Sequence, residues 1–280
     1  MKKFTINLIF SLALFLPFST YAWNQLAHMT IATIAYQHLN ASTLTKVNTL
    51  VQAFSQEYSD MNSFVAMSYW ADQERMTYGV TAYNRWHYYL HGFSTDGTPV
   101  LNTIANDSGA KIMSVAENTI KLTSVNQFDR ARFMAFAINI AGDMHQPLYT
   151  SNLFSSAFPN GTNGGTNYLI NYNGASVDLQ SFWDSGLGLF NAAPTTQNAA
   201  AHAATITALY PPSYFGSKVS DMSAGDWANE GYKDAQQFVY TVAANSTPSA
   251  AYIQTGQQMA QQRIALAGYR LANYLNTLLP

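Results

Sequence analysis

The stretch that decides the fold is RARFMAFAINIAGDMHQPLY, residues 130–149. From Arg130 to Ala141 its apolar side chains recur at three- and four-residue spacing, which is the period of an amphipathic helix. Asn139 and Asp143 are four residues apart, so a helix places them on one face. Proline disfavours helical backbone in the residue before it, so we expect Pro147 to end this helix. The stretch therefore predicts a helix that delivers two polar side chains to one place.

The same period recurs along most of the chain. Further helices are predicted over residues 27–51, 115–122, 197–209, 228–242 and 250–278. Ser223 and Asp226 are candidate N-caps near the start of one of them, because short polar side chains satisfy the first free N–H groups of a helix. The fold class is therefore all-α.

The segment from Ser151 to Ser185 breaks the helical rhythm. Glycines surround the alternating run YLINY, residues 168–172, and this pattern is typical of a loop with a short β-hairpin. No internal repeat or interdomain linker is visible. We therefore expect a single, mostly helical domain that carries a short hairpin and loop insertion.

The first residues have the features of a secretory signal peptide. Lys2 and Lys3 precede an apolar run from about Leu8 to Phe18, and the small side chain of Ala22 suits signal peptidase. Cleavage after Ala22 leaves a domain of residues 23–280 that begins with Trp23. No later stretch approaches the ~20 apolar residues of a membrane-spanning helix. We expect a secreted or periplasmic protein with no membrane span.

Composition limits how this domain can bind its ligands. The chain has no cysteine, so disulfides and thiolate metal ligands are excluded. It has 13 basic and 15 acidic side chains; without Lys2 and Lys3 the basic count is 11, and the net charge is −4 with histidine neutral. A protein that grips long nucleic acids through lysine and arginine is normally basic. Bound divalent metals could supply the missing positive charge locally.

Candidate metal ligands begin at the new amino terminus. Residues 23–28 read WNQLAH, so cleavage would place the α-amine of Trp23 five residues before the imidazole of His28. An α-amine with a pKa of roughly 8 is partly neutral near pH 7, and a metal favours the free base. Two interpretations stay open: Trp23 chelates an ion together with His28, or its side chain fills the core.

Three further motifs carry polar side chains of the same kinds. SYWAD, residues 68–72, ends in Asp72, and His87 follows fifteen residues later. GGTN occupies residues 164–167. In LQSFWDSGL, residues 179–187, Gln180 and Asp184 are four residues apart, as Asn139 and Asp143 are. A single histidine or aspartate is more often structural than a ligand, but several in this order point to a metal site.

Taken together, these motifs resemble the S1/P1 nuclease family, the trinuclear-zinc nucleases whose all-α fold is shared with zinc-dependent phospholipase C. The resemblance covers essentially the whole of residues 23–280. It rests on WNQLAH, on WAD with His87, on GDMHQPL from Gly142, on the GGTN loop and on SFWDSGL from Ser181.

The resemblance implies a ligand set for each of three zinc ions. The first ion would be held by the amine and carbonyl of Trp23, by His28 and by a bridging Asp143. The second would take Asp72, His87 and Asp143, but Asn139 stands where the family has a histidine. The third would take Asp184, but Tyr149 and Gln180 stand where the family has histidines.

These replacements change the expected metal content. Zinc favours about four N, O or S ligands, so Asp184 with a phenol and an amide makes a poor third site. We expect one or two Zn²⁺ ions rather than three. The second site is richer in oxygen than the family norm, and Ca²⁺, Mg²⁺ or Mn²⁺ suit oxygen ligands.

The resemblance also implies the chemistry. Its first reading is a phosphodiesterase that hydrolyses P–O3′ bonds in single-stranded DNA or RNA or in 3′-nucleotides, with Asp72 as the catalytic residue that orients or deprotonates the attacking water. The second is a non-catalytic relative that keeps a structural metal and binds a phosphate ligand. A third is lipid hydrolysis of the phospholipase C kind, against which Asp184 speaks, because the lipases of this fold have glutamate there. No protein partner is implied.

The remaining histidines and tyrosines have simpler interpretations. His145 lies two residues after Asp143, and a helix turns it away from that face, so we interpret it as structural. Many of the tyrosines, including Tyr88, Tyr89 and Tyr168, could stack on nucleic acid bases or pack in the core, and packing is favoured. His38, His91 and His202 lie outside the motifs, and we interpret them as ordinary structural residues.

Overall fold

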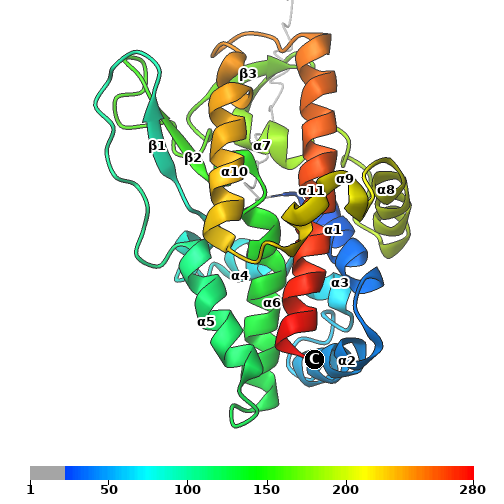
Figure 1. Cartoon of the computed structure of the whole chain (residues 1–280). Helices are drawn as coiled ribbons and strands as arrows, with labels where there is room; N and C mark the ends of the chain where they lie inside the picture. The colour runs from blue at the N-terminus through cyan, green and yellow to red at the C-terminus, as the bar shows by residue number, and fades with distance from the viewer. Residues whose placement is uncertain (1–22) are drawn as a thin grey trace, which may run out of the picture.

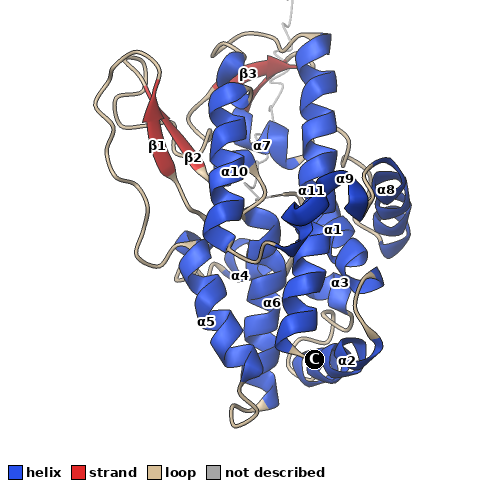
Figure 2. Cartoon of the chain, in the orientation of Figure 1, coloured by secondary structure: helices blue, strands red, loops and turns tan. Residues whose placement is uncertain are grey.

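The computed structural model describes residues 23–280 as one mostly helical body (Figure 1, Figure 2). The predicted signal segment, residues 1–22, lies outside the described residues. The expected all-α class is confirmed, with only short strands beside the helices. No helix within residues 23–280 has the length and apolar character needed to cross a bilayer.

The helices follow one another along the whole described chain. They are α1 Gln25–Gln37, α2 Ala41–Ser55, α3 Phe64–Met67, α4 Trp70–Tyr78, α5 Gly109–Lys121, α6 Gln127–Asp143, α7 Leu179–Asp184, α8 Thr196–Leu209, α9 Pro212–Phe215, α10 Ala224–Gln237 and α11 Ala250–Leu278. Short 3-10 helices cover Asn84–His87, Pro147–Tyr149, Gly216–Ser220 and Val239–Thr241. The strands are β1 His91–Ser94, β2 Ser151–Phe154, β3 Leu169–Tyr172 and β4 Ala175–Asp178.

The core lies where α6 and α11 run beside α1 in the middle of the molecule (Figure 1). The buried face of α1 includes Ile31 and Ile34, which are fully covered. Gly268 of α11 lets the two helices approach closely, because a Cβ added there would lie 2.6 Å from the Cβ of Ile34. α5 packs on α6 on the other side. This packing holds the last turn of α6 rigidly inside the molecule.

Several of the predicted helix boundaries are confirmed and others are corrected. The prediction over residues 250–278 matches α11, and that over 197–209 matches α8 within one residue. The helices predicted from residues 115 and 130 begin earlier, at Gly109 and Gln127. Ser223 does cap α10, since its Oγ accepts the N–H of Asp226 at 3.2 Å. Asp226 is therefore in the first turn, and its assignment as a cap is wrong.

Two predicted helices are broken by local hydrogen bonding. The stretch 27–51 is two helices, α1 and α2, because the Asn40 side chain accepts the N–H of Thr43 at 2.8 Å and starts a new helix. The stretch 228–242 ends its α-helix at Gln237, where Phe238 takes φ −138° and ψ −51°. Apolar periodicity continues across both breaks, so periodicity alone does not show them.

The strands form two small sheets. β3 and β4 are the predicted hairpin, antiparallel and joined by a turn in which Asn173 and Gly174 have φ of 51° and 78°. β1 and β2 pair in parallel, which the sequence did not indicate. This pairing matters for the site, because it ties the segment after His87 to the segment after Asp143.

Candidate metal centre

The structure brings His28, Asp72, His87 and Asp143 together from four elements that are far apart in sequence. Asp143 is the last residue of α6, His28 lies on α1, Asp72 on α4, and His87 ends the 3-10 helix Asn84–His87. All four side chains are buried. The sequence prediction that these residues gather is consistent with this placement.

The distances from His28 have the spacing of shared metal ligands. Its Nε2 lies 3.4 Å from Oδ1 of Asp143 and 3.6 Å from Oδ2 of Asp72. Donor atoms around a tetrahedral zinc, each bound at roughly 2.0–2.1 Å, lie about 3.3 Å apart. Neither ring nitrogen of His28 has a hydrogen-bond partner in the described residues, and Oδ1 of Asp143 has none either. Buried polar atoms of this kind normally have partners, so their arrangement fits a cation between them.

His87 and Asp143 form the tightest contact of the centre. Nδ1 of His87 lies 2.9 Å from Oδ2 of Asp143. Burial alone would lower the pKa of His87, but the hydrogen bond and the charge of Asp143 outweigh it, and the pKa is raised. Burial would raise the pKa of Asp143, but His28 and His87 outweigh it, and this pKa is lowered. Asp143 is therefore held as a carboxylate.

Gly142 and Trp23 shape the position of His28. A Cβ on Gly142 would lie 2.8 Å from both Cε1 and Nδ1 of His28, so the imidazole rests on the bare backbone of α6. The Trp23 side chain is fully buried, and its Nε1–H donates to the carbonyl of Gly142 at 3.0 Å. Trp23 thus fills the core beside Asp143. Chelation by its α-amine stays a prediction.

Asn139 takes a different role from the one expected of an oxygen ligand. Its Nδ2 donates to the carbonyl of Ser68 at 3.0 Å and to Oδ2 of Asp72 at 2.9 Å. Because a carbonyl can only accept, the first bond fixes the amide with its nitrogen toward Asp72. Oδ1 of Asn139 is buried without a partner. In this structure Asn139 therefore holds Asp72 by a hydrogen bond from its amide nitrogen. It does not present its amide oxygen to an ion bound at Asp72.

The three residues expected around a third ion are buried with unsatisfied polar atoms. The Tyr149 hydroxyl, both amide atoms of Gln180 and Oδ2 of Asp184 lack hydrogen-bond partners among the described residues. Oδ1 of Asp184 accepts from Nε2 of Gln146 at 2.6 Å. Burial raises the pKa of Asp184 well above its usual range, which favours its neutral form unless a cation lies beside it.

Arg75 is a member of the centre that sequence reasoning missed. Its Nη2 lies 3.4 Å from Oδ1 of Asp72, and its side chain is only 14 % exposed. Burial lowers its pKa, but the nearby Tyr149 and Asp72 outweigh burial and raise it, so the guanidinium keeps its charge. Asp72 and Arg75 are three residues apart on α4 and share a face, which is the signal that could have found it.

A cavity of about 420 Å³ opens beside the centre at Tyr88. The Tyr88 ring stacks on Tyr149, with ring centres 4.4 Å apart and planes at 12°. Its other walls mix polar side chains, among them Asn84, Arg85 and Asn163, with apolar ones such as Leu90 and Ile104. The volume suits a ligand about the size of a nucleotide.

The remaining side chains lie in ordinary packing positions. His38 contacts Tyr269, His91 stacks on Tyr232, and His202 contacts Phe190. Tyr168 is buried, and its hydroxyl donates to the carbonyl of Val242 at 2.8 Å. Tyr89 is half-buried against the core. None of these contacts involves the four gathered ligands.

Taken as a metal site, the fit of these residues is uneven. The distance between His28 and Asp143 and the distance between His28 and Asp72 each suit two ligands of one ion. Across residues 23–280, however, no three or more histidine, aspartate and glutamate side chains form a complete metal cage. The Trp23 amine is the donor predicted to complete the first site, and it would exist only after the predicted cleavage.

Comparison with known proteins decides the family. The family model described as S1/P1 Nuclease matches residues 23–280. The chain belongs to the S1/P1 nuclease family. It is 26% identical to nuclease S1 of Aspergillus oryzae, over 92% of each chain. It is also 24% identical to nuclease PA3 of a Penicillium species and 24% identical to nuclease P1 of Penicillium citrinum, each over 91% of this chain and 97% of the relative. The recognition made from the sequence motifs is confirmed.

Proposed function

We propose that this S1/P1 nuclease family member is a metal-dependent phosphodiesterase with fewer than three ions. It hydrolyses P–O3′ bonds in single-stranded DNA or RNA, in 3′-nucleotides, or in both. The observation that carries the proposal is the buried pair of His28 Nε2 and Asp143 Oδ1, which lie 3.4 Å apart and have no hydrogen-bond partner within residues 23–280. The nuclease names of its relatives support the substrate class.

Trp23, His28 and Asp143 would hold one Zn²⁺. When bound, zinc lowers the pKa of a water molecule toward neutrality and withdraws charge from a phosphoryl oxygen. Asp72, His87 and Asp143 form the second candidate site, where Ca²⁺, Mg²⁺ or Mn²⁺ compete with Zn²⁺ because most of its donors are oxygens. With Tyr149 and Gln180 where the family has histidines, the third site would be empty or weakly held.

The chain's own side chains supply the other parts of the reaction. Asp72 is the proposed catalytic residue, because its carboxylate faces the gathered ligands and is oriented by Asn139 and Arg75. It would orient the attacking water and accept its proton. Arg75 carries the positive charge that a phosphate needs. The cavity at Tyr88 would hold a base or sugar beside it.

Export completes the first site in this proposal. Cleavage after Ala22 would free the α-amine of Trp23, and the indole bond to Gly142 already anchors this residue beside Asp143. The protein would therefore be secreted or periplasmic and would gain its first metal after processing. A version that begins with one extra residue before Trp23 is expected to bind less zinc, and elemental analysis measures this directly.

The test of function is hydrolysis of single-stranded DNA, single-stranded RNA and 3′-AMP with added Zn²⁺, Mn²⁺ or Ca²⁺. Phosphatidylcholine serves as the substrate of the lipase alternative. An Asp143→Ala variant sets the background, and elemental analysis gives the number of ions. Turnover no greater than that of the variant, with every metal, would overturn the proposal.

A second candidate is a non-catalytic relative with a structural metal. It is favoured by Asn139, whose Nδ2 donates a hydrogen bond to Oδ2 of Asp72. It is also favoured by Tyr149 and Gln180, which stand where the family has histidine ligands. It predicts that chelation lowers the melting temperature while no phosphoester is consumed. Metal-dependent turnover of any of the three nucleic acid substrates excludes it.

A further inference from the structure

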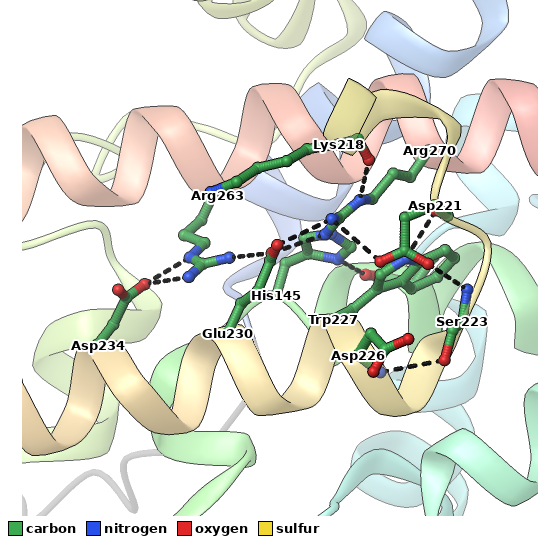
Figure 3. A network of polar contacts seen from close by, with 11 residues as sticks. His145, Lys218, Asp221, Ser223, Asp226, Trp227, Glu230, Asp234, Arg263 and Arg270 are labelled. Carbon is green, nitrogen blue, oxygen red and sulfur yellow. Dashed lines mark hydrogen bonds and ion pairs between the residues drawn. The ribbon is translucent and has the colours of Figure 1, made fainter. Parts of the chain in front are cut away.

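A second polar cluster joins α10 and α11 to His145, which lies just after the end of α6 (Figure 3). Its centre is Arg270 of α11, a fully buried arginine. The guanidinium donates to both carboxylate oxygens of Glu230 on α10, at 2.8 and 3.0 Å. Its Nε donates to the carbonyl of Lys218 at 2.9 Å. The same cation lies 5.7 Å from the centre of the Trp227 ring.

One bond of Arg270 reaches the segment that carries Asp143. Nδ1 of His145 lies 2.7 Å from the carbonyl oxygen of Ala141, so Nδ1 must carry the proton. Nε2 of His145 then accepts from Nη1 of Arg270, which lies 3.0 Å away. Because arginine cannot give up its proton in a protein, this contact holds His145 in a single neutral tautomer.

The hydrogen bond from His145 satisfies a backbone carbonyl at the C-terminal end of α6. The last four carbonyls of a helix have no partner within it, and Ala141, Gly142 and Asp143 are the last residues of α6. His145 satisfies Ala141, and the Trp23 indole donates to Gly142 at 3.0 Å. The backbone that bears Asp143 is thus held from two sides.

We propose that Arg270 is a positioning residue for the metal centre. It acts through His145, which fixes the last turn of α6 and so the direction in which the Asp143 carboxylate points. The inference rests on the proposed function only in that the centre binds a metal. It assigns the buried arginine a task beyond joining α10 to α11.

The chain offers a matched control in Arg263. This arginine also lies on α11 and also binds Glu230, at 2.7 Å, but its other partner is Asp234, to which Nε donates at 2.5 Å. It donates no hydrogen bond to His145. Arg263 is 11 % exposed and part of the same network, so its loss should cost stability without releasing the end of α6.

The experiment compares Arg270→Gln, Arg263→Gln and His145→Gln with the processed wild-type protein. Zinc affinity is measured by competition with a chromophoric chelator, and the visible spectrum of Co²⁺-loaded protein reports ligand geometry. Loss of an outer partner of a metal site typically weakens binding about 10–100-fold. We expect that loss, with an altered Co²⁺ spectrum, for Arg270→Gln and His145→Gln, and an unchanged spectrum with at most about a twofold loss for Arg263→Gln.

His145→Gln keeps the Arg270–Glu230 ion pair, so it covers the case in which Arg270→Gln fails to fold. The inference is overturned if His145→Gln binds zinc as the wild type does. It is also overturned if Arg263→Gln loses affinity by the same factor, since that result indicates a loss of general stability. A wild-type protein that binds no metal would instead remove the proposed function, and the inference with it. Nitrogen chemical shifts of His145, measured without metal, show separately whether Arg270 sets its tautomer.

Discussion

Two buried polar clusters flank the same turn of α6, and they are built in opposite ways. In the cluster around Arg270, the guanidinium, Glu230 and His145 are joined by hydrogen bonds. In the centre around Asp143, the polar atoms without partners include both ring nitrogens of His28, the Tyr149 hydroxyl and both amide atoms of Gln180. Arg270 and His145 are as fully buried as His28 and Asp143, whereas Glu230 is 21 % exposed.

The difference separates stability from function. A buried polar atom without a partner costs roughly 1–3 kcal/mol, so a set of them persists only where something else uses it. The Arg270 cluster meets the requirements of a folded interior by itself. The side chains of the Asp143 cluster do not meet them by themselves among the described residues.

The largest effect is expected from Asp143→Ala. Asp143 contacts both histidines, at 2.9 and 3.4 Å, so its removal takes a ligand from both candidate metal sites. We expect zinc binding to fall by more than about 100-fold and any phosphodiesterase activity to reach background. Elemental analysis and turnover measure this. Asp129→Asn, on the exposed start of α6, is the control and should change neither.

Next is Gly142→Ala, which tests the contact between α6 and His28. Alanine is favoured over glycine within helices by about 1 kcal/mol. Here its Cβ would lie 2.8 Å from the imidazole, and overpacking of this kind costs about 1–3 kcal/mol. We expect about tenfold weaker zinc binding with a near-constant melting temperature of the metal-free protein. Unchanged affinity would show that His28 can move without consequence. Gly225→Ala, at an open helical position, is the control.

The double variant Tyr149→His and Gln180→His asks whether the third site can be restored. Both positions are fully buried, and Asp184 already lies in the same set of unsatisfied side chains. Two imidazoles beside this carboxylate make a donor set that zinc accepts. We expect one additional Zn²⁺ per chain by elemental analysis, with a lowered pKa of Asp184. An unchanged zinc count would mean that more than these ligands separates this centre from a trinuclear one.

The smallest effect concerns Glu230 in the satisfied cluster. Burial opposes its ionisation, but Arg270 and Arg263 outweigh burial and lower its pKa to about 2. A lowered pKa stabilises the fold above the unfolded value of about 4.3, and this contribution is lost as pH falls toward 2. His145 and Asp234 also face this group, and Asp143 adds its own acid dependence. The melting temperature of the wild type should therefore fall more between pH 6 and pH 3 than that of Glu230→Gln, and equal falls would contradict this account.

The sequence indicated which polar side chains gather better than it indicated the contacts around them. His28, Asp72, His87 and Asp143 were singled out by their motifs, and the structure places these side chains together, while their role as ligands stays a prediction. Arg75 was missed because its three-residue spacing from Asp72 places both on one face of α4 but does not show that this face is buried. The hydrogen bonds of the Asn139 amide could not be predicted, since the carbonyl of Ser68, which fixes which way the amide points, lies far away in sequence. Parallel pairing of β1 with β2 was also missed, because residues 91–94 and 151–154 show no pattern that matches one to the other.

The helix boundaries show the same difference between what local sequence determines and what other contacts determine. The long stretch 250–278 was predicted correctly because apolar period and a Ser249 cap agree locally. The break between α1 and α2 was missed because a single asparagine overrides a continuing apolar pattern. Local rules thus described single helices well, whereas each error involves a contact between residues distant in sequence or one competing side chain.

The packing of α11 on α1 has a consequence for the order in which this molecule can assemble. The first ligand, His28, is made early in synthesis, but the helix that covers α1 comes last, at residues 250–278. Such distant contacts raise the contact order and slow folding. The face of α1 that packs on α11 therefore stays uncovered in the nascent chain until residues 250–278 have emerged. Placement of His28 on α1 thus depends on a helix that is made far later in synthesis.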